Sequence, residues 1–408
     1  MRKAVVILCL VLACTVSRGQ DVPACADMFR NQLVIPGDSL KLQRFASQMR
    51  ALRNQPDSTV TIWHIGGSHV QAGFFSSRLR HNFDSLGRFP MADRGFIFPY
   101  PLAQTNFDRS FRVGFDGEWI GSRSSNPNKK FPVQPRYGIM GIAAYSADTL
   151  ANFRLYYPEP LRRLHIMAQV SDTLVRPVAV SGSIRVPCEP DSMLPGFVAD
   201  FPVAVDSVKV LFDLHEGQHV VITGLLPETA RGRKGLCLLS TGVNGARTTT
   251  WLERCPDFLE QMSLVHPDLM LLGLGINDST MPAEDFKPEK FKANYRRLLD
   301  AILETSPDCA FVFISNNDSW RYARRRMVHN DNGNAVRQAM LELAEEIIHV
   351  VFACRARDVW NKEFTIFRCS HCVVWTRNKQ SFSWFSLELR GHKRHHFTEQ
   401  ATCINSSF

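Results

Sequence analysis

Three short polar motifs contain residues that together could carry out acyl transfer: "GGSHVQAG" at 66–73, "GVNGA" at 242–246 and "GIND" at 275–278. Cleaving an ester requires a nucleophile, a base that takes its proton, and hydrogen-bond donors for the oxyanion. Ser68 is the candidate nucleophile. The backbone N–H groups of Ser68 and Gly245 and the side-chain amide of Asn277 are candidate oxyanion donors, because glycine permits close approach and an amide donates without charge.

Each motif follows an apolar stretch typical of a buried strand, at 59–65, 235–240 and 268–272. Helical patterns alternate with these strands, at 71–86, 248–265, 287–306 and 334–348. This alternation predicts a parallel sheet that is covered by helices on both faces. In such sheets the functional site lies beyond the carboxyl ends of the strands, so the three motifs should meet at one edge.

Changes in the expected secondary structure along the chain define the expected domains. The α/β pattern occupies residues 20–96 and resumes at 234–353. Between these two parts, residues 97–233 contain short alternating stretches separated by turn residues, which predict an antiparallel β-sandwich or jelly roll. Residues 354–408 have no clean helix or strand period. The predicted fold class is therefore α/β, a three-layer parallel-sheet domain with an inserted, jelly-roll-like antiparallel β-sandwich.

The first residues predict export. Residues 1–19 contain a charged start, a short apolar core and small residues before Gln20, as signal peptides do. The stretch "VLAC" at 11–14 also resembles a lipobox, in which Cys14 would be the lipidated residue. No later stretch reaches the roughly 18 apolar residues of a membrane-spanning helix. We therefore expect a periplasmic or cell-envelope protein, either free or anchored through Cys14, with no transmembrane segment in the mature chain.

In order and placement, "GGSHVQAG", "GVNGA" and "GIND" resemble the first three sequence blocks of the SGNH (GDSL-type) hydrolases. Gly67 stands where that family usually has an aspartate. A β domain between the first two blocks is similar to the layout of the bacterial peptidoglycan O-acetylesterases. The resemblance implies a serine esterase that removes acetyl groups from wall glycan and needs no cofactor. It also implies Ser68 as nucleophile, with Ser68, Gly245 and Asn277 forming the oxyanion hole.

The last block of the family is Asp-x-x-His, and its best match here is "KRHHFT" at 393–398. The resemblance makes His396 the catalytic base, but Lys393 stands in the place of the aspartate. A carboxylate there orients the imidazole and stabilises its cation, whereas a lysine repels that cation. The abrupt loss of the family pattern across 354–390 is also what a reading-frame error in the gene would produce.

Two other functions fit the same motifs. A lipase or acylhydrolase acting on small acyl esters would use the same residues, although the inserted β domain favours a glycan. A glycan-binding protein that has lost catalysis would explain Lys393. Ser68 could instead cap a helix, Gly245 could serve a turn, and Asn277 could brace a loop. His64 and His69 flank Ser68 and are interpreted as structural.

The remaining polar clusters do not predict another kind of site. The pair "CSHC" at 369–372 lacks a second pair at regular spacing, so no metal site is predicted. The run "RYARRR" at 321–326 has no nucleic-acid motif beside it and is interpreted as the solvated face of a helix. The formal charge is +9, and residues 349–408 carry nine basic against four acidic residues. Such a charge suits binding to an anionic wall polymer.

Replacing Lys393 with aspartate tests whether His396 is the base. If residues 393–396 lie over Ser68 as in the family, Lys393→Asp should raise kcat on an aryl acetate, because the carboxylate fixes the imidazole tautomer and stabilises its cation. The loss of such a carboxylate from a working triad costs about 10⁴-fold in rate, which bounds the gain. Equal, low activity in both forms would count against His396 and favour the glycan-binding or frame-error interpretation.

Overall fold

The computed structural model describes residues 32–35, 40–55, 57–317, 319–347 and 350–354. The predicted leader with Cys14, the motif "CSHC", Lys393 and His396 all lie outside the described residues. In the part that is described, no helix is long and apolar enough to cross a membrane.

A six-stranded sheet forms the centre of the α/β part, in the order β1-β17-β14-β13-β2-β12. Its strands are β1 (Gln32–Val34), β2 (Thr59–Gly66), β12 (Gly235–Gly242), β13 (Leu269–Gly273), β14 (Ala310–Ile314) and β17 (Val350–Cys354). All pairs are parallel except β1 with β17. The direction in which successive strands are added reverses between β2 and β13. At such a reversal the connections diverge to opposite sides and leave a crevice at the carboxyl ends of the two strands.

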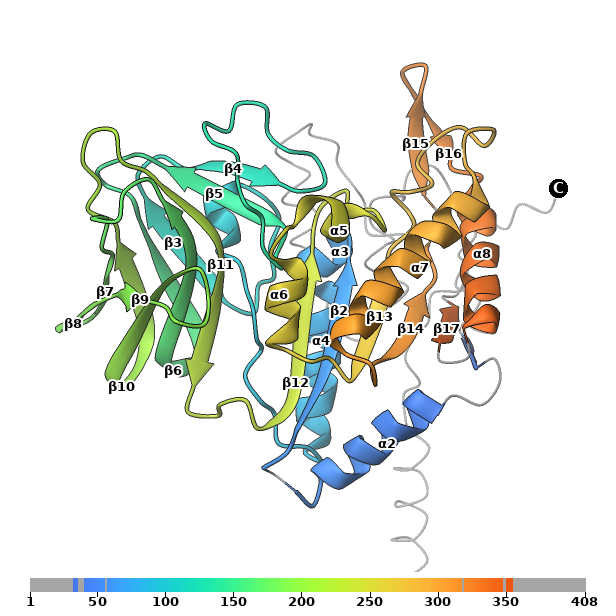
Figure 1. Ribbon diagram of the computed structural model, residues 1–408, viewed down its shortest axis with the longest axis horizontal. Coiled ribbons are helices and arrows are strands. Elements are labelled where there is room, and N and C mark those ends of the chain that lie inside the picture. The colour runs from blue at the N-terminus through green and yellow to red at the C-terminus, as the bar shows by residue number, and fades with distance from the viewer. Residues whose placement is uncertain (1–31, 36–39, 56, 318, 348–349, 355–408) are drawn as a thin grey trace, which may run out of the picture. The chain divides into compact units, whose positions relative to one another are not determined.

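Helices cover both faces of this sheet (Figure 1). They are α2 (Leu40–Leu52), α3 (Ser68–Gln71), α4 (Phe74–Leu86), α5 (Thr250–Arg254), α6 (Phe258–Ser263), α7 (Pro288–Thr305) and α8 (Gly333–Glu346). Because side chains alternate along a strand, β2 supplies both cores. Val60 and Ile62 pack in a cluster with α2 and α4, whereas Trp63 and Ile65 join the cluster that contains α6, α7 and α8.

An antiparallel domain interrupts the α/β part between β2 and β12. Its strands are β3 (Arg112–Asp116), β4 (Ile120–Arg123), β5 (Ile142–Ser146), β6 (Asn152–Val170), β7 (Val178–Ser181), β8 (Ile184–Pro187), β9 (Glu189–Pro190), β10 (Gly196–Leu211) and β11 (Val220–Thr229). The long strand β6 pairs with β3 along its first part and with β11 along its second, while β10 accompanies both parts with register shifts. All nine strands thus belong to one connected antiparallel sheet. The predicted fold class, a three-layer α/β domain with an inserted antiparallel β domain, is confirmed.

Three glycines stand side by side at the carboxyl edge of the parallel sheet. Gly66 of β2 is in register with Gly242 of β12 and with Gly273 of β13. A β-carbon on Gly242 would lie 2.1 Å from the backbone nitrogen of Gln71, and one on Gly66 would lie 2.5 Å from Cγ2 of Val70. Both contacts are with the short helix α3, through its backbone at Gly242 and through the Val70 side chain at Gly66, so α3 packs directly on the sheet edge. Only glycine leaves room for this packing.

The structure corrects two local predictions. Residues 248–265, expected as one helix, form two short helices, α5 and α6, because Pro256 lacks an N–H and disfavours helical geometry at Cys255. The run "RYARRR", expected on a helix face, forms the hairpin β15 (Trp320–Ala323) and β16 (Arg326–His329). Its two-residue turn places Arg324 and Arg325 at φ values of 45° and 63°. Left-handed geometry costs a residue with a β-carbon about 1–2 kcal/mol. The hairpin forms despite this cost and despite the high helix propensity of arginine, because its two strands pair.

We predict that Gly242→Ala will damage both stability and catalysis. The added methyl group meets backbone rather than a movable side chain, so α3 must shift. Overpacking of this kind costs about 1–3 kcal/mol in the free energy of unfolding. A displaced Ser68 should lower kcat by about 10²-fold. Urea unfolding and aryl acetate turnover would measure the two effects.

Gly114→Ala is the matched control, because Gly114 is an exposed glycine in β3 with no atom within 4 Å of the added β-carbon. It should leave both quantities nearly unchanged. Equal effects of the two substitutions would contradict the proposed contact between α3 and the sheet.

Candidate active site

Ser68 lies directly beyond the carboxyl end of β2, as the first residue of α3. The helix N-cap is Gly67, whose carbonyl oxygen accepts hydrogen bonds from the N–H groups of Val70 and Gln71, both at 3.1 Å. Ser68 makes no side-chain capping bond. Neither its hydroxyl nor its N–H is hydrogen-bonded to any residue that the structure describes. The half-buried hydroxyl is therefore available for chemistry.

Asn277 follows β13 and lies beside the residue before Ser68. Its Nδ2 donates to the carbonyl oxygen of Ala246 at 2.9 Å and lies 3.3 Å from the point where a β-carbon on Gly67 would stand. A primary amide has two hydrogens, so the second remains for an oxyanion. The missing side chain at Gly67, where the family has aspartate, leaves this side of the amide open.

Gly245 follows β12 and is exposed. Its φ of 81° is in the left-handed region, which favours glycine. Its N–H donates to no residue within the described ranges. The carboxyl ends of β2, β12 and β13 are adjacent in the sheet, so the three candidate donors come from neighbouring loops.

A carboxylate joins the loops that carry Gly245 and Asn277. Asp278 accepts hydrogen bonds from Thr248, at 2.6 Å from Oγ1 and 3.1 Å from the backbone N–H. Thr248 is fully buried. Burial raises the pKa of the Asp278 carboxyl, against the hydrogen bonds from Thr248, which lower it. Asp278 thus fixes the spacing between two oxyanion donors without being placed to react itself.

A network of amide side chains supports Ser68 from the opposite side. Asn106 Nδ2 donates to the carbonyl oxygen of Ser68 at 3.2 Å, and Gln71 Nε2 donates to the carbonyl oxygen of Asn106 at 2.7 Å. The Oε1 atom of Gln71 accepts the N–H of Asn244 at 2.7 Å. Thr105 Oγ1 accepts hydrogen bonds from both Gln71 and Asn244. This network connects the serine turn, the Gly245 loop and the beginning of the insertion.

Sequence reasoning missed this network. Gln71 and Asn244 lie inside the same motifs as Ser68 and Gly245. Their position in these motifs could have identified them as residues near the site. Thr105 and Asn106 follow the 3₁₀ helix η2 (Tyr100–Ala103) in the inserted segment, where nothing in the sequence marks them.

The two histidines near Ser68 differ in their surroundings. His64 is buried in β2, where its Nδ1 lies 3.1 Å from Ser76 Oγ and its ring meets the edge of Phe75 at 4.7 Å between centroids. His69 is half-buried on α3. No histidine in the described part of the chain is hydrogen-bonded to the Ser68 hydroxyl. His396 therefore stays a prediction. Among these residues there is also no group of three His, Cys, Asp or Glu side chains that could hold a metal ion.

Comparison with known proteins concerns the family and the fold. Residues 217–367 match the family described as "GDSL-like Lipase/Acylhydrolase family", a range that includes Gly245 and Asn277. No curated protein matches the chain. A solved structure titled "Peptidoglycan O-acetylesterase in action, 5 min" is similar with a TM-score of 0.58 and 16% identity, over 79% of this chain and 85% of that one. At this identity the likeness concerns the fold.

Two further solved structures are more distant. A family two carbohydrate esterase from Cellvibrio japonicus gives a TM-score of 0.26 at 10% identity, over 65% of this chain and 96% of that one. A family two carbohydrate esterase from Clostridium thermocellum in complex with cellohexaose gives 0.27 at 12% identity, over 57% and 93%.

Asp278→Ala should lower both stability and kcat, because the N–H and hydroxyl of Thr248 lose their acceptor. An unpaired buried donor costs about 1–3 kcal/mol in the free energy of unfolding. The loosened loop should lower kcat by up to about 10²-fold. Asp278→Asn keeps an acceptor oxygen and should stay close to the parent in kcat.

The same pair predicts a dependence on pH. Since the native state holds the Asp278 proton more tightly than the unfolded state, the parent loses stability relative to Asp278→Asn as pH rises from about 4 through the raised pKa. Urea unfolding across this range measures the difference. A difference that does not change with pH would show that the pKa of Asp278 is not raised.

Proposed function

We propose that this chain is a carboxylic ester hydrolase of the GDSL-like lipase/acylhydrolase family that residues 217–367 match, and that it is an exported serine esterase that removes O-acetyl groups from cell-wall glycan. The observation that carries the reaction is the edge beyond β2, where the Ser68 hydroxyl is unbonded among the described residues and the amide of Asn277 lies beside Gly67.

In the first half of the proposed reaction, Ser68 Oγ attacks the acetyl carbonyl carbon and its proton passes to His396. The carbonyl oxygen becomes an oxyanion that accepts hydrogen bonds from the N–H groups of Ser68 and Gly245 and from Asn277 Nδ2. Donors that the fold holds in place require little reorganisation when the charge forms. The bond to the sugar oxygen then breaks, and the sugar hydroxyl leaves with the proton that His396 carried.

The second half regenerates the enzyme. A water molecule gives a proton to His396 and attacks the acetyl-serine, and the oxyanion forms again at the same three donors. Acetate leaves, and Ser68 recovers its proton from His396. Each donor contributes most strongly to the charged tetrahedral states, so it should affect kcat more than substrate affinity.

Two observations support glycan as the substrate. The antiparallel domain inserted between β2 and β12 provides an additional surface that cleavage of a small ester would not require. The solved structure that shares this fold at a TM-score of 0.58 is titled as a peptidoglycan O-acetylesterase. The leader sequence at 1–19 would bring the protein to the compartment in which wall glycan lies.

We expect Ser68→Ala to abolish acetate release from O-acetylated peptidoglycan and from an aryl acetate, because loss of the nucleophile costs several orders of magnitude in rate. Ser85→Ala is the control, since Ser85 is an exposed serine on α4. Activity of Ser68→Ala within about tenfold of the parent would remove Ser68 from the mechanism. Hydrolysis of aryl esters by the parent, without acetate release from peptidoglycan, would contradict the glycan substrate.

A further inference from the structure

The hairpin β15–β16 rises from the same edge of the sheet as the candidate active site. It is inserted between the carboxyl end of β14 and the start of α8 (Figure 1). The Asn330 side chain at its base donates to Ser319 Oγ at 3.0 Å and to Ser279 Oγ at 3.3 Å. Asn332 Nδ2 donates to the carbonyl oxygen of Ser279 at 2.9 Å. Ser279 belongs to the loop that carries Asn277, so the hairpin is joined to the oxyanion loop.

The strand register gives the hairpin two different faces. Trp320 pairs with His329 and Tyr322 pairs with Met327, whereas Arg321 pairs with Val328 and Ala323 with Arg326. Because side chains alternate along a strand, the first two pairs form one face, which is aromatic, and the other two form the opposite face, which is basic. Tyr322 is 77% exposed on the aromatic face.

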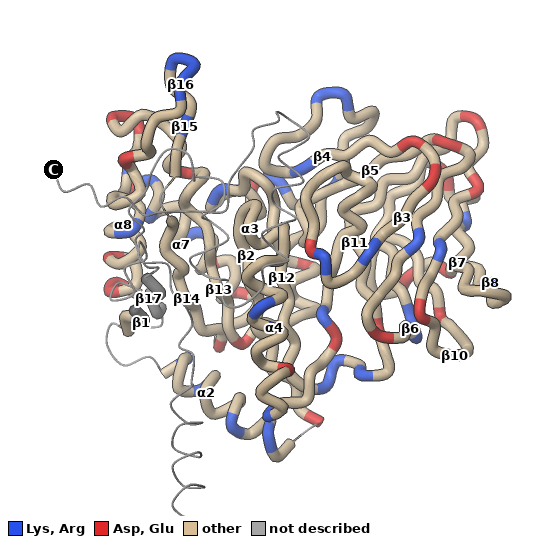
Figure 2. Tube along the Cα trace, turned by 180° about the vertical axis from the view of Figure 1, so that it is seen from behind, with Lys and Arg blue, Asp and Glu red and all other residues tan. Residues whose placement is uncertain are grey.

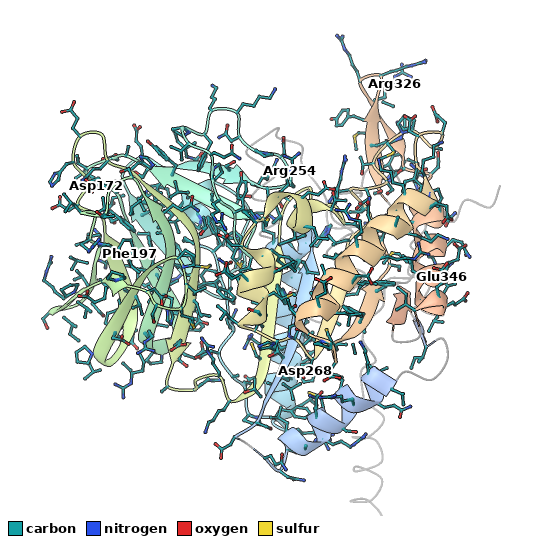
Figure 3. All side chains as sticks on the ribbon, in the orientation of Figure 1. Asp172, Phe197, Arg254, Asp268, Arg326 and Glu346 are labelled. Carbon is teal, nitrogen blue, oxygen red and sulfur yellow. The ribbon has the colours of Figure 1, made fainter. Side chains whose placement is uncertain are left out.

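The tip of the hairpin is strongly basic. Arg324, Arg325 and Arg326 are exposed, and Figure 2 shows an uninterrupted basic tip there. In Figure 3, Arg326 lies on the hairpin at a distance from the body of the sheet. Within the described residues, no carboxylate lies within ion-pair distance of Arg321 or of these three arginines.

The turn itself is an unusual place for arginine. Arg324 and Arg325 both have positive φ, the geometry of a two-residue turn that Asn-Gly adopts with least strain. Neither side chain makes a hydrogen bond or an ion pair with the described residues that would offset the strain. Strained backbone that carries unpartnered charge is typical of a position maintained for binding.

We propose that the hairpin 320–329 is a binding element for a carboxylate-bearing wall glycan, which it holds beside the active site. The choice of polymer rests on the proposed function. Guanidinium groups bind carboxylates with two parallel hydrogen bonds, and an exposed tyrosine ring offers a flat surface for a sugar. A chain of sugars bound here would continue toward the loop of Asn277. One exposed ring beside charged groups is too little apolar surface for insertion into a membrane.

The test uses a variant that removes charge and relieves strain together. Arg324→Asn with Arg325→Gly introduces the preferred turn sequence, so the hairpin should persist and the Tm should be equal to or higher than that of the parent. The matched control is Lys129→Gln with Lys130→Gln, which removes the same charge from an exposed loop of the inserted domain. Co-sedimentation with de-O-acetylated peptidoglycan sacculi measures binding without turnover.

We expect the turn variant to bind sacculi at least about tenfold more weakly than the parent, because it loses charge-assisted hydrogen bonds to carboxylates. The control should bind within about twofold of the parent. The parent should bind sacculi with amidated carboxyl groups as weakly as the turn variant binds untreated sacculi. Aryl acetate turnover should be unchanged in both variants. Tyr322→Thr, which keeps strand propensity, should also weaken binding.

Several outcomes would overturn the inference. These are unchanged binding of the turn variant, equal losses in the control, equal binding to amidated sacculi, or tighter binding of the parent to phosphatidylglycerol vesicles or duplex DNA. Failure of the proposed function gives a different pattern. In that case the parent releases no acetate from O-acetylated peptidoglycan, yet its binding to sacculi still depends on Arg324 and Arg325.

Discussion

The close approach of the α3 backbone to the sheet edge is the contact on which the rest of the site depends. Gly242 lets the end of β12 lie against the backbone of Gln71, and Gly66 lets the end of β2 lie against the side chain of Val70. The turn that carries Ser68 is therefore packed directly on the ends of both strands. Ser68 also lies at the reversal of strand order between β2 and β13, the position at which sheets of this kind bind their ligands.

Neutral hydrogen-bond donors surround this point. In the proposed reaction, the amide of Asn277 and the N–H groups of Ser68 and Gly245 would stabilise a transient negative charge without a permanent counter-ion. These two N–H groups have no acceptor among the described residues. The carboxylate of Asp278, next to Asn277, is engaged by Thr248 and joins two of the loops. Burial between these loops raises the pKa of the Asp278 carboxyl. The structural carboxylate of Asp278 is thus adjacent in the sequence to Asn277, the candidate oxyanion donor.

The inserted antiparallel domain also contributes to the site. Asn106 supports the carbonyl of Ser68 and, through Gln71, is connected to the loop of Gly245. The insertion and the α/β part share one continuous apolar core, which contains Trp63 and Ile65 of β2 together with Ile97 and Leu225. The insertion is therefore packed against the α/β part and hydrogen-bonded to the turn of Ser68.

The sequence alone determined the alternation of strands and helices, the antiparallel insertion, and the three motifs at strand ends, because apolar periodicity and turn residues are local properties. It also indicated Ser68, Gly245 and Asn277 as a set. Only the tertiary structure decided that Gly66, Gly242 and Gly273 form one row, that Asn106 reaches Ser68, and that Asp278 binds Thr248. Those facts depend on strand order and register, which join residues far apart in the chain. The arginine run, which is expected from the sequence on a solvated helix face, is a hairpin because residues 320–323 pair with 326–329, and this pairing outweighs the helix propensity of arginine.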